Sequence, residues 1–380
     1  MAGFLPKVIR MLNRVVPKDR RSVYFRSTYL YPDNVEAVLE TLLDRGQGHY
    51  RLYLETPVFS YADRPVHPLR SRGTALWRYL RSAYVFSNVG MFGNPAPVKS
   101  QITVNLWHGV SFKKIGFYLT PDEKPYPTST YVVTYSDLFA QVMAKAFGVE
   151  LDHVLTTGEP RNDYLFHPLS LQELNAAGIP LKEGQKFVFW MPTYRQSKYE
   201  DQDDGGRYDL GFPFLTAETL VELNDFCARQ GILLALKWHG LQRLPERLDA
   251  ERLGNLVFLT SESLSEMHLP LYRVLACADG LITDYSSVFI NYMLLDRPMC
   301  FAYDDLACYQ QNRGFMFDDV EQYMPGMRTQ TFAGVLEFLR RVAAGEDPER
   351  ALRHRLAPVL NRHQDGENAA RLLKTLGLID

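Results

Sequence analysis

The stretch DGLITDYSSV, residues 279–288, places a short apolar run directly before a polar turn. Gly280–Thr283 has the composition of a buried strand, and a helical pattern follows over Ser286–Leu295. A strand that leads through a turn into a helix is the repeating unit of a parallel sheet. The first amides of that helix, together with its serine hydroxyls, would also suit a diphosphate group. The alternative is that Asp284 or Ser286 simply caps the helix.

The same alternation of apolar strands and helical patterns extends along the chain in both directions. The first set of strand candidates is Val23–Phe25, Tyr50–Leu54, Tyr84–Ser87, Ile102–Leu106 and Tyr131–Thr134. The second set is Phe187–Met191, Leu233–Lys237, Leu256–Leu259, Gly280–Thr283 and Met299–Tyr303. Helical patterns lie between them at Asp33–Leu43, Tyr135–Ala146, Ala217–Arg229 and Ser286–Leu295. This order predicts an α/β fold of two doubly wound, Rossmann-like domains that face a central cleft, with ligands at the carboxyl ends of the strands.

A polar stretch near His167–Ala177 separates the two sets of strands and sets the expected domain boundary. We expect an amphipathic helix over residues 1–21, a first domain over 22–167, and a second domain over 168–350. A helical tail over residues 351–380 could cross back to the first domain. The length of 380 residues fits two domains.

Composition excludes several classes of protein. The net charge of −2 gives no general basic field, so nucleic acid is not an expected partner. The 4 cysteines show no C-x-x-C spacing and are expected to be buried, reduced thiols. No apolar run reaches the roughly 18–20 residues of a membrane-spanning helix, and no signal peptide is recognisable.

The first residues combine an apolar stripe with a basic rim, which is the pattern of a helix that lies in a membrane surface. The alternative is a helix packed on its own domain. The residues predicted to meet an anionic membrane are Phe4, Leu5, Lys7, Val8, Ile9, Arg10, Leu12 and Arg14. A second stretch, Leu69–Ser82, sets arginines beside Trp77 and Tyr79 and is a further candidate for the headgroup layer, with a solvated helix face as the alternative.

Two histidines follow apolar strands, one in each predicted domain. His108 lies in LWHGVSFKKIG, residues 106–116, and His239 lies in LKWHG, residues 236–240. An imidazole at the carboxyl end of a strand can accept a proton from an attacking hydroxyl near neutral pH, although an isolated histidine is more often structural. We expect the two histidines to face each other across the cleft.

Two arginines offer planar forks that suit phosphate oxygens. Arg161 lies in TGEPRND, residues 157–163, where Asn162 or Asp163 could instead cap the next helix. Arg195 lies in MPTYR, residues 191–195, which could equally be a surface turn. No metal site is expected, because the histidines lack partners at ligand spacing. Cationic side chains and a helix N-terminus would then carry the charge of a diphosphate.

Taken in order, the motifs W-H-G-x-x-x-K-K-I-G, T-G-x-P-R-N-D, P-T-Y-R, L-K-x-H and L-I-T-D-Y-S-S-V resemble the CDP-glycerol glycerophosphotransferase family. Its members are the teichoic-acid and capsule glycerol- and ribitol-phosphate transferases. The resemblance runs from about Tyr29 to Gly326. It implies a GT-B fold, a CDP-polyol donor bound mainly by the second domain, and peripheral attachment to the cytoplasmic face of the cell membrane.

The resemblance implies that His108 and His239 are the catalytic residues. The donor-binding residues that it implies are Trp107, Gly109, Val110, Ser111, Arg161, Thr193, Tyr194, Arg195, Lys237, Trp238, Thr283, Asp284, Tyr285, Ser286, Ser287 and Val288. The sequence departs from the family pattern at Val110-Ser111, where Thr-Pro is common, at Glu159, a frequent aromatic, and at Gly240, a frequent proline. These departures leave the polyol and the acceptor open.

The expected reaction moves glycerol phosphate or a related group from CDP-glycerol or CDP-ribitol to a hydroxyl of a lipid-linked acceptor, without a metal or another cofactor. The acceptor would be a polyprenyl-diphosphate saccharide or a phospholipid-type molecule, and CMP would leave. One alternative is a GT-B glycosyltransferase that uses a nucleotide sugar. Another is a catalytically inactive, membrane-bound binding module. The sequence leaves open whether the enzyme is a primase or a polymerase, and whether it forms a homo-oligomer.

Overall fold

The computed structural model describes residues 4–28, 32–55, 61, 63–109, 112–120, 122–123, 126–193, 208, 210–238 and 252–380. The chain divides into two compact units. Unit 1 consists of Met1–Val110, Ile115–Phe166 and Val359–Asp380. Unit 2 consists of Ser111–Lys114 and His167–Pro358. Four residues within the first histidine motif, Ser111–Lys114, are therefore assigned to unit 2, and the residues from Val359 onward belong to unit 1.

Unit 1 is built on a parallel sheet of 7 strands in the order β3-β2-β1-β4-β5-β6-β7. The strands are β1 (Asp19–Arg26), β2 (Arg51–Glu55), β3 (Val66–Leu69), β4 (Ser82–Ser87), β5 (Ile102–Asn105), β6 (Tyr131–Val133) and β7 (Val154–Leu155). The helices are α1 (Phe4–Val15), α2 (Asp33–Arg45), α3 (Arg72–Arg81), α4 (Asp137–Phe147) and α13 (Asn368–Thr375), with 3-10 turns η1 (Gly116–Tyr118), η2 (Leu151–His153) and η3 (Pro160–Phe166). The strand order reverses direction between β1 and β4, as in doubly wound sheets.

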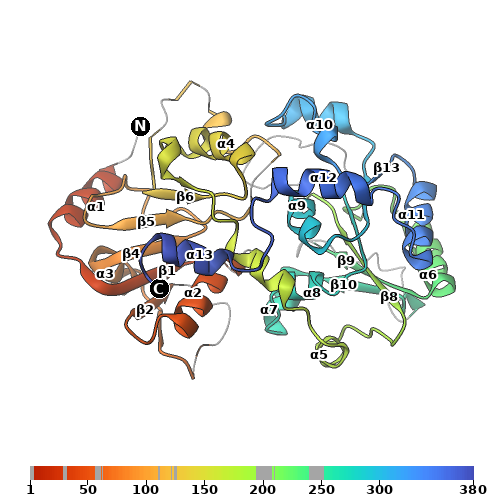
Figure 1. Ribbon diagram of the computed structural model, residues 1–380, viewed down its shortest axis with the longest axis horizontal. Coiled ribbons are helices and arrows are strands. Elements are labelled where there is room, and N and C mark those ends of the chain that lie inside the picture. Colours follow the sequence, from red (N-terminus) through yellow and green to blue (C-terminus); the bar gives the residue numbers. More distant parts are fainter. Residues whose placement is uncertain are drawn as a thin grey trace. The chain divides into compact units, whose positions relative to one another are not determined.

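Both faces of this sheet are buried, because neighbouring residues of a strand point to opposite sides. Val23 and Phe25 of β1 enter one core, which Leu372 and Leu373 of α13 complete. Tyr24, between them in sequence, enters a second core on the other face. Helix α13 lies against α2 and η3 (Figure 1). The end of the chain thus forms part of the hydrophobic core of unit 1.

Unit 2 has a parallel sheet of 6 strands in the order β10-β9-β8-β11-β12-β13. The strands are β8 (Lys186–Met191), β9 (Ile232–Lys237), β10 (Leu256–Leu259), β11 (Gly280–Thr283), β12 (Met299–Ala302) and β13 (Met327–Thr329). The helices are α5 (Leu171–Ala176), α6 (Ala217–Gln230), α7 (Ser261–Glu266), α8 (Leu271–Leu275), α9 (Val288–Tyr292), α10 (Leu306–Asn312), α11 (Phe332–Ala344) and α12 (Arg350–Leu360), with 3-10 turns η5 (Met293–Leu295) and η6 (Glu321–Tyr323). Here the strand order reverses between β8 and β11. The two doubly wound sheets confirm the predicted α/β class.

Two local expectations need correction. The single helix expected over Ser286–Leu295 begins later, at Val288, and passes into a 3-10 turn at Met293. The cysteines are all free thiols, but they are not all buried, because Cys308 is exposed.

Candidate functional site

The turn that carries His108 has an unusual backbone. It follows β5 directly, and Trp107 has a φ of 49°, in the left-handed region that a bulky side chain normally avoids. Gly109, on the other side of the histidine, has a φ of 123°. The indole of Trp107 stacks on the imidazole, with the ring centroids 4.0 Å apart. Strained positions of this kind persist where surrounding contacts impose them, and they are concentrated at functional sites.

Two asparagine side chains impose this conformation. Oδ1 of Asn105 accepts a hydrogen bond from the backbone N–H of Trp107 at 2.9 Å. Nδ2 of Asn34, in the first turn of α2, donates to the carbonyl oxygens of Leu106 at 3.3 Å and of Trp107 at 3.2 Å. Oδ1 of Asn34 also accepts from the backbone N–H of Arg161 at 3.0 Å. One buried amide therefore joins the His108 turn to the second sequence motif.

Sequence reasoning missed Asn34. Its position directly after Pro32-Asp33, at the start of a predicted helix, is typical of a residue that stabilises a helix end. The side chain is 1% exposed, and its partners are 72, 73 and 127 residues away in the chain. The sequence gives no clear signal for this role, because Asn34 lies between two further polar residues of α2, Asp33 and Glu36, which are also buried.

Arg161 lies in the interior of unit 1 and is 5% exposed. Its Nε is 2.7 Å from Oε2 of Glu159, and its Nη2 donates to the hydroxyl oxygen of Tyr135 at 3.4 Å. Because this ion pair is desolvated, removing Glu159 would take a countercharge away from a buried guanidinium and destabilise unit 1. The described contacts of Arg161 hold the second motif in place, and its predicted contact with the donor stays a prediction.

Asp163, the next charged residue of the motif, caps a helix that is distant in sequence. Its Oδ1 accepts from the backbone N–H of Asn368 at 2.8 Å, and its Oδ2 accepts from that of Ala369 at 2.8 Å. For Asp163, the expected alternative of a cap on the next helix is therefore wrong, since α13 lies 205 residues further along the chain. Burial raises the pKa of Asp163 to about 7, although the donated hydrogen bonds oppose that rise.

In unit 2 the two motifs predicted to hold a diphosphate meet where the strand order reverses. Oδ1 of Asp284, which is fully buried, accepts from the backbone N–H of Thr193 at 2.7 Å and from that of Ser286 at 3.2 Å. The hydroxyl of Thr283 donates to the carbonyl oxygen of Met191 at 2.7 Å. The carboxylate of Asp284 thus forms a turn with the backbone N–H two residues later, at Ser286, before α9 begins at Val288. The side chains of Ser286 and Ser287 remain half-buried beside this junction.

Two of the predicted donor residues have their side chains in the core of unit 2. Trp238 is 5% exposed, donates from Nε1 to the carbonyl oxygen of Leu210 at 2.8 Å, and stacks on Phe258. Tyr285 is 1% exposed and packs against other aromatic rings. Both side chains position the strands and turns of the site, and direct contact with a donor stays a prediction.

Lys237 and Val288 are the remaining donor candidates within the described chain. Nζ of Lys237 donates to the hydroxyl of Ser261 at 3.1 Å. Val288 is buried at the start of α9. The other candidates, Val110, Ser111, Tyr194, Arg195 and His239, lie outside the described residues. Among the residues that are described, no group of three or more His, Cys, Asp or Glu side chains could hold a metal ion.

The segment that follows the His108 turn is anchored in unit 2. Phe112 is 3% exposed and packs against Phe289, with the ring centroids 5.2 Å apart. The backbone N–H of Lys114 donates to the carbonyl oxygen of Gly314 at 3.2 Å. This segment therefore has partners on the helix and loop that follow the Ser286 turn.

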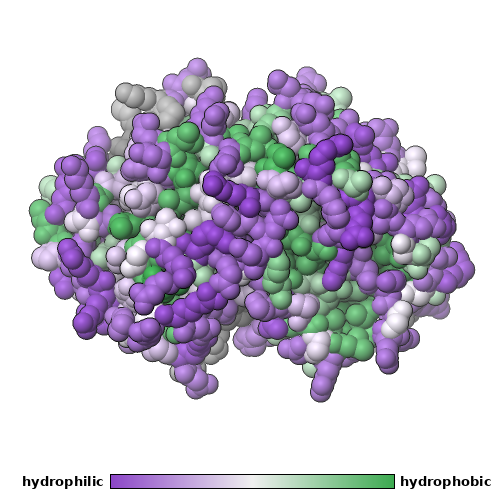
Figure 2. Space-filling model, in the orientation of Figure 1, coloured by the Kyte–Doolittle hydropathy of each residue, from purple (hydrophilic) through white to green (hydrophobic). Residues whose placement is uncertain are grey.

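Helix α1 packs along one edge and leaves another apolar edge exposed. Ile9 is 2% exposed and joins the core, and Nδ2 of Asn13 donates to Oε1 of Gln101 at 2.8 Å. Phe4 and Val15, in contrast, are 84% and 70% exposed. Figure 2 shows hydrophobic surface where α1 lies, at the left of the view. The single apolar face expected from the sequence is therefore divided between the core and the surface.

The other predicted membrane residues follow this division. Leu5, Lys7 and Arg14 are exposed, whereas Val8, Arg10 and Leu12 are half-buried. Within the described chain, no helix is both long and apolar enough to span a bilayer.

Comparison with known sequences gives one consistent family. A family model described as CDP-Glycerol:Poly(glycerophosphate) glycerophosphotransferase matches residues 8–378. The teichoic acid ribitol-phosphate polymerase TarK of Staphylococcus aureus is 27% identical over 294 residues, which are 73% of this chain and 52% of that protein. The teichoic acid ribitol-phosphate primase of Bacillus spizizenii is 26% identical over 292 residues, 72% of this chain and 69% of that protein. The chain spans about half the length of the first curated relatives that it matches.

Comparison with solved structures shows the fold. The wall teichoic acid polymerase TagF superposes with a TM-score of 0.74 at 18% identity, covering 98% of this chain and 93% of that chain. A UDP-GlcNAc 2-epimerase from Neisseria meningitidis superposes with a TM-score of 0.53 at 10% identity, covering 93% and 99%. The match to TagF confirms the predicted GT-B fold.

Proposed function

Because the chain belongs to the CDP-glycerol:poly(glycerophosphate) glycerophosphotransferase family, we propose that it transfers glycerol phosphate, or a related polyol phosphate, from a CDP-linked donor to an acceptor hydroxyl. The acceptor is lipid-linked, and the product belongs to a teichoic-acid or capsule-like polymer. The observation that carries the proposal is the His108 turn. Its strained backbone is fixed by two asparagines at the carboxyl end of a strand, where doubly wound sheets bind ligands.

In the proposed reaction His108 accepts the proton of the acceptor hydroxyl. The oxygen then attacks the β-phosphorus of the donor, a new phosphorus–oxygen bond forms, and the bond to CMP breaks. CMP leaves with the electron pair, and the proton passes from His108 to solvent. Phosphoryl transfer of this kind requires mainly correct positioning and stabilisation of charge.

The donor diphosphate is proposed to bind in unit 2, beside the junction of β8 and β11. Two features support this site. The strand order reverses there, and the hydrogen bonds of Asp284 hold the two turns in a fixed relation. The half-buried hydroxyls of Ser286 and Ser287 supply donors for phosphate oxygens. Arg195, Arg161 and His239 are proposed to stabilise the phosphate charge without a metal ion.

Attachment to the cytoplasmic face of an anionic membrane is proposed through the exposed edge of α1. Phe4, Leu5 and Val15 would enter the lipid, while Lys7 and Arg14 would meet the headgroups. The half of the helix that packs in the core then fixes its orientation on unit 1.

Release of CMP from a purified sample tests the reaction. The protein is incubated with CDP-glycerol or CDP-ribitol and a lipid-linked acceptor, and CMP is measured over time. UDP-sugars in place of the CDP-polyols form the control arm. The proposal requires CMP formation that depends on the acceptor. Release of UDP from a UDP-sugar, without any CMP release, would instead establish a glycosyltransferase, and no release from either donor class would favour the inactive binding module.

A further inference from the structure

A pocket of about 250 Å³ opens in unit 1 beside the His108 turn. Ser87, the last residue of β4, and Asn105, the last residue of β5, both line it. From the carboxyl ends of β4 and β5 the pocket extends to Ser129, which directly precedes Thr130 and strand β6. The carboxyl ends of strands are where doubly wound sheets bind their ligands. All of the lining residues belong to unit 1.

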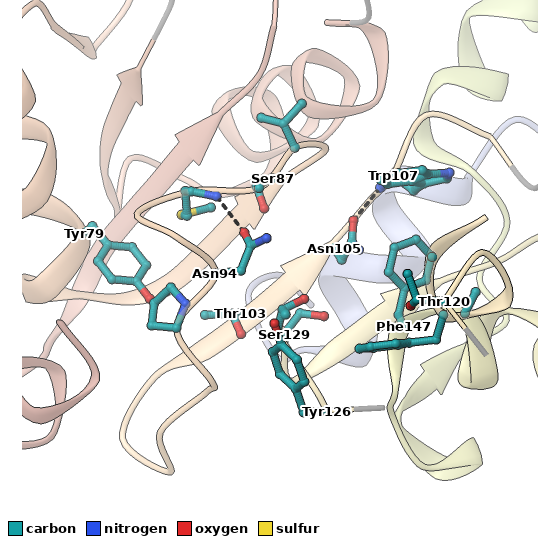
Figure 3. A pocket seen from close by; sticks show the side chains of 18 residues that line it. Tyr79, Ser87, Asn94, Thr103, Asn105, Trp107, Thr120, Tyr126, Ser129 and Phe147 are labelled. Carbon is teal, nitrogen blue, oxygen red and sulfur yellow. Dashed lines mark hydrogen bonds between the residues drawn. The ribbon is translucent and has the colours of Figure 1, made fainter. Parts of the chain in front are cut away.

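The lining combines aromatic rings with neutral polar groups. Trp107 and Phe147 meet edge to face at one side, with the ring centroids 4.9 Å apart. Tyr126 and Phe117 form a second aromatic pair. Figure 3 shows Thr103 and Ser129 between Tyr79 on one side and Trp107 on the other. None of the described residues that line the pocket has a charged side chain.

Three lining groups have hydrogen-bonding capacity to spare. Ser129 is 6% exposed, and its hydroxyl has no partner in the described part of the chain. Asn105 uses Oδ1 for the N–H of Trp107, and Asn94 uses Oδ1 for the N–H of Met91 at 3.0 Å. Within the described residues, these bonds leave the side-chain NH₂ groups of both asparagines available to a ligand. A buried hydroxyl without a partner is costly, and a ligand that pairs with it recovers that cost.

The aromatic and neutral polar character of the described lining residues favours one of two classes of acceptor. A phosphodiester-linked polyol chain carries a negative charge at each unit, and proteins bind such groups with arginine, lysine or clustered N–H donors. A saccharide is neutral, presents hydroxyls at its edge and has apolar C–H faces that pack on aromatic rings. The small volume, below the roughly 300–1,000 Å³ of drug-sized sites, suits a single sugar unit.

We propose that this pocket binds the terminal, uncharged saccharide unit of the acceptor. The inference rests on the proposed transferase function and adds the chemical class of the acceptor. Trp107 lines the pocket and stacks on His108, so the pocket and the proposed base share this indole as a neighbour. The enzyme would then add polyol phosphate to a saccharide in preference to a growing polyol-phosphate chain.

The test uses two variants that alter the pocket away from the His108 turn. Tyr126→Ala removes a ring that is 39% exposed, and Ser129→Ala removes the hydroxyl that lacks a partner among the described residues. Ser100→Ala, at an exposed serine outside the pocket, is the matched control. The probes are a short-chain alkyl glycoside of a neutral disaccharide and a glycerol phosphate trimer. Binding is followed by tryptophan fluorescence, and acceptor KM by CMP release from CDP-glycerol.

We expect each pocket variant to weaken disaccharide binding and to raise its KM about three- to tenfold, the loss of one neutral hydrogen bond or ring contact. The KM for CDP-glycerol should not change in either pocket variant. In Ser100→Ala, neither disaccharide binding nor any KM should change. Equal disaccharide binding by wild type and both variants would overturn the pocket assignment. Tighter binding of the trimer, weakened by the same substitutions, would overturn the assignment to a neutral ligand. Binding of the disaccharide without CMP release from any acceptor would leave the pocket in place and refute the transferase function.

Discussion

Replacing Asn34 by alanine removes three hydrogen bonds, two to the His108 turn and one that ties this turn to the Arg161 motif. Two are donated to the carbonyl oxygens of Leu106 and Trp107, and one is accepted from the backbone N–H of Arg161. At about 0.5–1.5 kcal/mol for each bond, the substitution should cost about 1.5–4.5 kcal/mol of stability, of which the two bonds to the turn itself account for about 1–3 kcal/mol. The left-handed conformation of Trp107 costs about 1–3 kcal/mol by itself. The lost bonds are therefore worth as much as the strain that they maintain, and the turn should relax.

Relaxation of the turn should displace the imidazole of His108. A displacement of about 1 Å at a reacting group can cost about 10²-fold in rate, so we expect Asn34→Ala to lower kcat by about 10- to 100-fold. The KM for the CDP-linked donor should change less than kcat, because the proposed diphosphate site is in unit 2 and Asn34 contacts only the backbone of Arg161. CMP release gives both constants, and thermal denaturation gives the loss of stability.

Asn224 provides a matched control in the other unit. Its Nδ2 donates to the carbonyl oxygen of Arg252 at 3.2 Å, and its Oδ1 accepts from the backbone N–H of Asn255 at 3.0 Å. Asn224→Ala should lower Tm by a similar amount without the specific loss of kcat. If both variants lose the same stability and Asn34→Ala keeps its full kcat, Asn34 has no positioning role and the reasoning is refuted.

Four further predictions follow from the described residues. His108→Ala should reduce the transfer rate about 10²–10⁴-fold while donor binding is retained. His49→Ala, at an exposed histidine, should change neither the rate nor donor binding. If His108→Ala keeps more than about a tenth of wild-type turnover, His108 is not the general base. CMP release should persist in excess EDTA, and loss that Mg²⁺ restores would contradict the metal-free proposal. Membrane attachment is tested with a Phe4→Ser/Leu5→Ser variant, because deleting residues 1–17 would also remove the buried Ile9. The variant should float less than wild type with anionic liposomes, at an unchanged Tm. Equal flotation would contradict the role of α1 as a membrane anchor. Burial raises the pKa of Asp163 from 3.8 to about 7, so the contribution of this group to folding stability is greatest below pH 3.8 and falls as the pH rises to 7. Asp163→Asn should therefore flatten the dependence of Tm on pH over that range. An unchanged slope would contradict the raised pKa.

The fold class could be predicted because strands buried on both faces leave continuous apolar runs in the sequence. The runs predicted at Phe187–Met191 and Leu233–Lys237 correspond to β8 and β9, which are buried along almost their whole length. Strand β3, Val66–Leu69, was missed because it contains His67 and Pro68 and lies at the edge of its sheet, where proline is tolerated.

The site could be predicted only in part, because its supporting contacts are distant in sequence. His108 at the end of a strand has a local signature. No local signature predicts the hydrogen bonds of Asn34 or the cap that Asp163 provides for α13. Their partners are up to 127 residues away for Asn34 and up to 206 residues away for Asp163. The burial of Trp238 and Tyr285 could not be predicted either. An aromatic residue beside a motif can contact a ligand or pack in the core, and the sequence does not distinguish the two.

The contribution of α13 to the core of unit 1 has a consequence for synthesis on the ribosome. Domains generally fold in the order in which they emerge, with the N-terminal domain first. Here Leu372, Leu373 and Leu378 fill the core that β1 and β2 begin, and Asp163 has no helix to cap until Asn368 has been added. The whole of the 167–358 segment of unit 2 is translated before these residues appear. The core of unit 1 is therefore completed last, although unit 1 is the first to be translated. A nascent chain that stops before Leu372 would expose an incomplete apolar core to chaperones and proteases.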